Sequence, residues 1–203
     1  MVEQDVSTSQ ENTMKSLPRL LMLLAGLGLV VLFFSPMWKI TLIAPQYPAG
    51  VTMKIWINKI GGDEPGVLQN INILNHYVGM KYIEPESIPE LKYFQYIMMF
   101  MAGLGVLFAA LNRGGLFLTW GILMTLLAIA GLYDFYLWEY DYGHSLSDTA
   151  PIKIPGASFQ PPLLGTKQII SFTAKSFPDV GGYVTGLSVL LSYVAWWLKS
   201  KMK

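Results

Sequence analysis

The stretch LFLTWGILMTLLAIAGLYDFYLW, residues 116–138, decides the fold class. Its only charged side chain is Asp134. It is long enough to supply the ~20 apolar residues that a helix needs to cross the hydrocarbon core of a bilayer. The whole chain is 53% hydrophobic and 13% charged, whereas soluble domains carry about 25% charged residues. We therefore interpret 116–138 as a transmembrane helix of an integral membrane protein.

Three further apolar stretches have the same character. The turn Asn112-Arg113-Gly114-Gly115 joins one of them directly to 116–138, which predicts a helical hairpin. Polar residues 1–16 read as a disordered tail, and 199–203 as a short basic tail. The sequence thus predicts an all-α membrane protein with two outward loops forming a small mixed α/β cap, and with four transmembrane helices at 17–37, 93–111, 116–138 and 182–198.

The distribution of basic residues predicts the orientation. Lys15, Arg19, Arg113, Lys199 and Lys201 fall at one end of the predicted helices, and the other end mixes lysines with many acids. Cytoplasmic flanks of membrane helices carry an excess of Lys and Arg, with short loops weighing most. We therefore expect a bacterial inner-membrane protein with both ends cytoplasmic and the two larger loops periplasmic.

The first outward loop, 38–92, is too long to be a simple connector. Apolar and polar residues alternate from Val51 to Asn58, which predicts a half-buried strand. Val67, Ile71 and Leu74 then recur at helical spacing. The second loop, 139–181, is rich in Pro and Gly and has a possible strand over 168–173.

Both histidines of the chain, His76 and His144, fall in the predicted outward part. His76 and Met80 would share one face of a helix, if that segment is helical. A His/Met set is soft enough for Cu(I), and His144 would make a third ligand. A His/carboxylate set would instead suit Zn²⁺, Cu²⁺ or another divalent ion. The alternative is that each histidine is a structural hydrogen-bonding residue of a loop.

Asp134 is an acid inside a predicted span, and such acids suggest function by default. Near a helix end it would equally serve as a hydrogen-bond acceptor for its Tyr-rich surroundings. A net charge of +1 without a long basic block argues against nucleic-acid binding. The absence of cysteine excludes disulfides, thiolate metal sites and cysteine nucleophiles. Enzyme motifs such as a phosphate-binding Gly-rich loop are missing, so no catalytic residue is predicted.

Several blocks of the sequence resemble a known family. They are YPAG (47–50), KIWINKI (54–60), QNINILNHYVGMK (69–81), DFYLWEYDYGH (134–144) and QPPLLGTKQ (160–168). Together they resemble small multi-span membrane proteins associated with nitrous oxide reductase gene clusters of denitrification. The resemblance implies an accessory protein that handles copper on the periplasmic face, because that reductase is a copper enzyme assembled there.

The residues that match such a role are His76, Met80 and His144, with Glu139 and Asp141 as supporting or alternative ligands. The first hypothesis is an accessory protein that assists assembly or copper loading of a periplasmic copper enzyme. The second is a structural subunit whose loops dock a partner within a larger membrane complex, without a metal site. Apart from the lipid bilayer, the expected partners are that periplasmic copper protein or other membrane subunits. An enzyme or transporter is the least favoured alternative.

Overall fold

The computed structural model describes residues 16–202 apart from 155, 157 and 170–171, so most of the predicted N-terminal tail lies outside the described residues. The chain divides into two compact units. A helical unit is built from Met1–Phe34, Gln95–Ala128 and Tyr183–Lys203. A sheet unit is built from Ser35–Phe94 and Ile129–Gly182.

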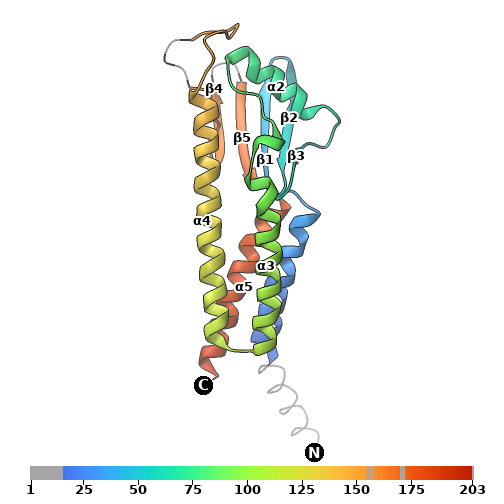
Figure 1. Ribbon diagram of the computed structural model, residues 1–203, viewed down its shortest axis with the longest axis vertical. Coiled ribbons are helices and arrows are strands. Elements are labelled where there is room, and N and C mark those ends of the chain that lie inside the picture. Colours follow the sequence, from blue (N-terminus) through green and yellow to red (C-terminus); the bar gives the residue numbers. More distant parts are fainter. Residues whose placement is uncertain (1–15, 155, 157, 170–171, 203) are drawn as a thin grey trace, which may run out of the picture. The chain divides into compact units, whose positions relative to one another are not determined.

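In the described part of the chain, four helices are long and apolar enough to cross a membrane. They are the N-terminal helix Ser16–Phe33, whose last turn is the 3₁₀ segment η1 (Leu29–Phe33), α3 (Glu90–Leu111), α4 (Gly114–His144) and α5 (Val180–Lys201) (Figure 1). In each helix, only 22–33% of the most apolar 18-residue stretch is buried. Most of the apolar side chains therefore face outward, as expected for helices surrounded by lipid.

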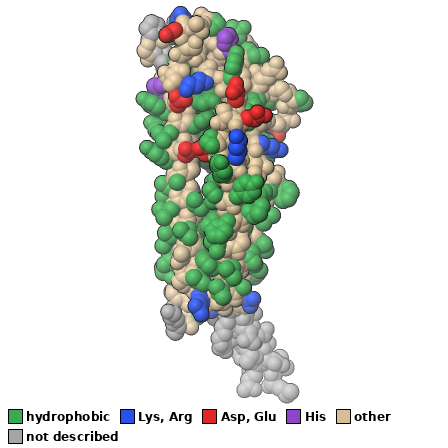
Figure 2. Space-filling view, in the orientation of Figure 1, with side chains coloured by type: hydrophobic (Ala, Val, Ile, Leu, Met, Phe, Trp, Pro, Cys, Tyr) green, Lys and Arg blue, Asp and Glu red, His purple; other side chains and the backbone are tan. Residues whose placement is uncertain are grey.

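Small residues let these helices approach one another. A Cβ atom at Gly26 would lie 3.0 Å from the backbone of Gly105, so the N-terminal helix and α3 cross at two glycines. A Cβ atom at Gly114 would lie 3.2 Å from the Lys199 side chain. The α3–α4 turn and the end of α5 are therefore neighbours within the helical unit. Figure 2 shows hydrophobic side chains over the visible face of this unit and basic side chains at that end.

The prediction of an all-α fold is wrong in part, because the sheet unit contains a β-sheet. Both outward segments contribute to one five-stranded antiparallel sheet with strand order β3-β2-β1-β5-β4. The strands are β1 (Trp38–Ala44), β2 (Tyr47–Ile55), β3 (Ile60–Gly61), β4 (Gly165–Ile169) and β5 (Phe172–Pro178). The central pair β1–β5 joins the two outward segments, for example Ile40 opposite Ser176. The chain is therefore a helical membrane-type protein with a sheet domain, rather than all-α.

The predicted strands and the predicted helical spacing of the two loops fall on elements of the sheet unit. The alternating residues 51–58 lie largely within β2, and the possible strand at 168–173 overlaps the β4–β5 hairpin, whose residues 170–171 lie outside the described residues. The predicted helical spacing from Val67 corresponds to α2 (Val67–Val78). Strand β1 was not predicted, although its buried residues Ile40, Leu42 and Ala44 alternate with less buried neighbours.

The core of the sheet unit lies on one face of the sheet. Ile40 and Leu42 of β1 and Met53 of β2 are buried there with Ile71 of α2 and Tyr142 of α4. Both α2 and the C-terminal part of α4 thus cover the same face of the sheet. A short 3₁₀ turn, η2 (Pro85–Ser87), connects this core to α3.

Candidate functional site

Helix α2 ends in a turn that shapes the candidate site. Gly79 has φ 82°, a left-handed conformation that costs glycine least. The Met80 amide donates to the Asn75 carbonyl (2.9 Å), and the Gly79 amide to that of His76 (3.2 Å). These two bonds form a Schellman motif, which ends the helix at Val78. Met80 therefore lies beyond the helix, and the shared helical face expected for His76 and Met80 does not form.

The segment that follows is held against α2 by a side-chain clamp. The Asn72 side chain accepts a hydrogen bond from the Ile83 amide (2.7 Å) and donates one to the Ile83 carbonyl (3.1 Å). Ile83 is 5% exposed and belongs to the core. This clamp fixes the chain between α2 and α3 as one wall of the sheet unit.

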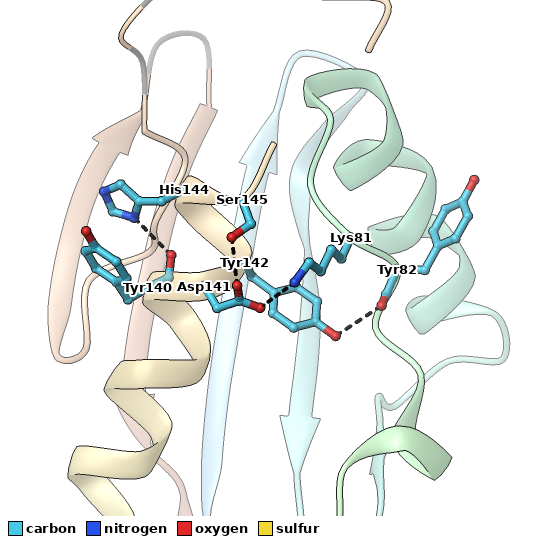
Figure 3. Close-up of polar contacts among 7 residues, drawn as sticks. All are labelled: Lys81, Tyr82, Tyr140, Asp141, Tyr142, His144 and Ser145. Carbon is cyan, nitrogen blue, oxygen red and sulfur yellow. Dashed lines mark hydrogen bonds and ion pairs between the residues drawn. The ribbon is translucent and has the colours of Figure 1, made fainter. Parts of the chain in front are cut away.

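The end of α4 is tied to the same segment (Figure 3). Lys81 Nζ donates to Asp141 Oδ2 (2.7 Å), and Ser145 Oγ donates to Asp141 Oδ1 (2.7 Å). These hydrogen bonds, the one from Lys81 first, hold the pKa of Asp141 below its ordinary value. The Tyr142 hydroxyl donates to the Tyr82 carbonyl (3.1 Å). Asp141 is therefore engaged in an exposed polar network.

Neither histidine faces a cluster of potential metal ligands. The exposed His76 ring stacks on Tyr82, with 6.0 Å between centroids. The His144 ring stacks on Tyr140 at 4.0 Å, and its Nδ1 donates to the Tyr140 carbonyl (2.9 Å). No group of three or more His, Asp and Glu that could hold a metal ion occurs among the described residues. Copper binding through these residues stays a prediction.

A cavity of about 320 Å³ lies between the covered face of the sheet, α2 and the end of α4. Its walls are mainly apolar and include Leu42, Met53, Ile71, Phe159 and Phe172. Three of the lining residues are exposed, namely Gln46, Tyr77 and Ile152, and these mark its mouth. Among the predicted metal ligands, Met80 and Glu139 line this cavity, and His76, Asp141 and His144 do not.

Glu139 is the unusual member of the cavity wall. It follows the predicted spanning stretch 116–138 and belongs to the sheet unit. Its side chain is 1% exposed, and neither carboxyl oxygen has a hydrogen-bond partner among the described residues. Burying an unpaired carboxylate is costly, so the neutral form is favoured. Burial accordingly raises the pKa of Glu139 to about 8.

The other buried polar side chains of this unit do have partners. Trp38 Nε1 donates to Ser176 Oγ (2.7 Å), and that hydroxyl donates to the Leu163 carbonyl (3.0 Å). Asn75 Nδ2 donates to the Lys81 carbonyl (3.4 Å). Burial without a partner thus distinguishes Glu139 from its neighbours.

One loop closes the cavity at the end of α4. Phe159 is 2% exposed, and its amide donates to the Gly143 carbonyl (3.0 Å). A Cβ atom at Gly143 would collide with the backbone of Gln160. Glycine at this position therefore allows the loop to lie directly on the helix. The sequence pattern gave no sign of this contact, because it joins residues of two different elements.

Asp134, the other acid singled out in the sequence, is exposed on α4. It is absent from the residues that line the cavity. Glu139 was predicted only as a supporting or alternative metal ligand. The position of Glu139 just after a long apolar stretch was visible in the sequence. Its burial arises from the sheet and from the loop around Phe159.

Comparisons of the chain with protein-family models, with curated proteins and with solved structures gave no match. The resemblance to proteins associated with nitrous oxide reductase thus stays a prediction from the sequence.

Proposed function

We propose that this protein is a membrane-anchored accessory protein whose sheet unit binds a small, largely apolar molecule. The observation that carries the proposal is the unpaired, buried carboxyl of Glu139 in the wall of an apolar cavity. Ligand pockets are usually apolar and carry a few polar groups that orient the ligand. A ligand group would supply the partner that Glu139 lacks.

The volume and the lining of the cavity favour its interpretation as a ligand site over that of a packing defect. Protein interiors pack with few voids larger than a water molecule, whereas this cavity measures about 320 Å³. That volume falls at the lower end of the ~300–1,000 Å³ typical of small-molecule sites. Exposed residues at the mouth, such as Gln46 and Tyr77, offer a route from solvent.

The four apolar helices supply the anchor. We infer a multi-pass protein of a bacterial inner membrane, with both ends cytoplasmic and the sheet unit periplasmic. The positive charges near the α3–α4 turn and at the end of α5 support this orientation, because Arg113 and Lys199 belong to one end of the helical unit.

A role in copper loading of a periplasmic enzyme remains a second proposal that rests on the sequence resemblance. Its test is metal binding to purified protein, wild type against the double variant His76→Ala/His144→Ala. Weaker copper binding by the double variant would support the role, and equal affinity and stoichiometry would contradict it.

The cavity itself is tested by filling it. Leu74 and Ile73 are neighbours on α2; Leu74 lines the cavity, whereas Ile73 is exposed and does not. We expect Leu74→Trp to abolish binding of small apolar probes (hexylamine, hexanol and hexanoic acid) to the protein in lipid nanodiscs, and Ile73→Trp to leave it unchanged. Calorimetric titration, with empty nanodiscs as the blank, measures this binding. Equal binding by both variants, or no binding of any probe to the wild type, would contradict the proposed function.

A further inference from the structure

The charge character of the cavity narrows the class of its ligand. Among the described residues that line the cavity, Glu139 is the only acid, and none is Lys, Arg or His. The titratable neighbours are Tyr77 from α2 and Tyr142 from α4, while the lining residues of β1, β2 and β5 are all apolar. The cavity therefore offers an acid without a cation to balance it.

We propose that the ligand is an amine, in which an apolar body fills the cavity and a terminal ammonium group pairs with the Glu139 carboxylate. This inference rests on the proposed function and names the chemical class of its ligand. A cation is the partner that compensates a buried carboxylate best, because it removes the cost of an isolated charge. A ligand carboxylate would instead bring a negative charge into a cavity whose described lining residues include no cation.

Aromatic residues line the same cavity as Glu139, and their rings suit an ammonium group. Trp138 and Tyr142 lie one position before and three positions after Glu139 on α4, and their ring centroids are 4.4 Å apart. Phe159 and Phe172, which also line the cavity, stack at 6.2 Å with an interplanar angle of 11°. Faces of aromatic rings attract cations and pack against apolar groups. The same walls can therefore hold both ends of an amphiphilic amine.

Binding would exchange one proton. In the unliganded protein at pH 7 the Glu139 carboxyl holds its proton, because burial raises its pKa to about 8. The ammonium group binds the ionised carboxylate, so the O–H bond of Glu139 breaks and its proton passes to solvent while the ligand keeps its own proton. Tyr142 stays neutral, since burial raises its pKa. Amine affinity should consequently rise about tenfold per pH unit below the pKa of Glu139.

The experiment compares three probes of one chain length, hexylamine, hexanol and hexanoate, with the whole protein in nanodiscs. Calorimetric titrations at pH 6, 7 and 8 give the affinities. We expect hexylamine to bind most tightly, and its affinity to rise about tenfold between pH 6 and pH 7. Glu139→Gln should remove both the preference and the pH dependence. Asp141→Asn, which alters an exposed carboxylate two positions away, should change neither.

Proton release gives a second measurement that needs no variant. Titration of the wild type with hexylamine at pH 7, in two buffers of different ionisation enthalpy, should show release of nearly one proton. Tighter binding of hexanol or hexanoate, or amine binding without proton release, would overturn the amine assignment and leave the proposed function standing. Failure of all three probes to bind would overturn both.

Discussion

The two units differ in the kind of buried group that lacks a hydrogen-bond partner among the described residues: in the helical unit it is the neutral amide oxygen of Asn112, and in the sheet unit it is the carboxyl group of Glu139. In the helical unit Trp120 is fully buried, and its Nε1 donates to the Met101 carbonyl (2.8 Å). The hydroxyls of Thr125 and Tyr193 lie 2.9 Å apart and share a hydrogen bond. In the sheet unit, Glu139 is equally buried and has no partner among the described residues. Since an unpaired buried acid costs stability, this difference supports the proposed ligand site in the sheet unit.

The first prediction tests whether the buried carboxyl of Glu139 lowers the free energy of unfolding. Glu139→Met replaces an unpaired acid by an apolar side chain of similar length, and we expect it to raise the free energy of unfolding at pH 7 by about 3 kcal/mol. Chemical unfolding followed by circular dichroism measures the change. Destabilisation by Glu139→Met would mean that the carboxyl is paired in the folded protein.

The pH dependence of the wild type follows from the same group. The folded state keeps a proton on Glu139 that the unfolded chain loses above the ordinary pKa of 4.5. The wild type should therefore lose stability, relative to Glu139→Gln, as pH rises from 4.5 to about 8, and no further above that. The slope is at most about 1.4 kcal/mol per pH unit. Parallel pH profiles of the two proteins would contradict a raised pKa.

A matched pair of glycines on α4 tests how the loop closes the cavity. Gly143 touches the backbone of Gln160, whereas a Cβ atom at Gly131 would meet nothing within 4 Å. Gly143→Val should destabilise the sheet unit by about 2–3 kcal/mol through overpacking, and Gly131→Val should have little effect. Chemical unfolding followed by tryptophan fluorescence, compared between the two variants, measures both effects. Equal effects would show that the loop does not depend on this contact.

Trp120→Phe is the counterpart of the Glu139 substitution in the helical unit. It removes the hydrogen bond to the Met101 carbonyl, and we expect a loss of about 1–2 kcal/mol. The two units should thus respond with opposite sign to removal of a buried polar group. A neutral or stabilising Trp120→Phe would break the comparison between them. Both variants need measurement under the same detergent and denaturant conditions.

The smallest change in the free energy of unfolding is expected for a substitution at the surface. Lys81 and Asp141 form an ion pair at 2.7 Å, with half of each side chain exposed. Lys81→Met should cost less than about 1 kcal/mol, because exposed pairs contribute little and are screened by salt. Unfolding at low and high salt should therefore show a difference between variant and wild type only at low salt. A larger loss would give this pair a structural role comparable to the Asn72 clamp.

The sequence predicted the helical unit better than the sheet unit, for a physical reason. The apolar stretch 116–138 and its three counterparts carry their signal in their own length and composition. The pairing of β1 with β5 instead joins segments far apart in the chain, such as Trp38 and Pro178. No local pattern specifies such a partner, so the sequence predicted a strand in each loop and a small mixed α/β cap, but not the strand pairing that joins the two loops in one sheet.

The candidate site shows the same limit. Helical spacing placed His76 and Met80 together, but Gly79 ends α2 between them. Glu139 was visible as an acid near the end of a long helix, and the sequence could not show that a sheet and the Phe159 loop bury it. The positive φ of Gly79 could have been suspected from the glycine itself. The burial of Glu139 is a property of the tertiary fold alone.

The protonation state of Glu139 tests the central claim most directly. Infrared difference spectroscopy between the wild type and Glu139→Gln, each at pH 7 in nanodiscs, isolates the signal of this carboxyl group. We predict the C=O band of a protonated carboxylic acid in the unliganded protein, replaced by carboxylate bands when hexylamine is added. A carboxylate signal in the unliganded protein, unchanged by the amine, would contradict the claim that the sheet unit holds a buried, unpaired acid for a ligand.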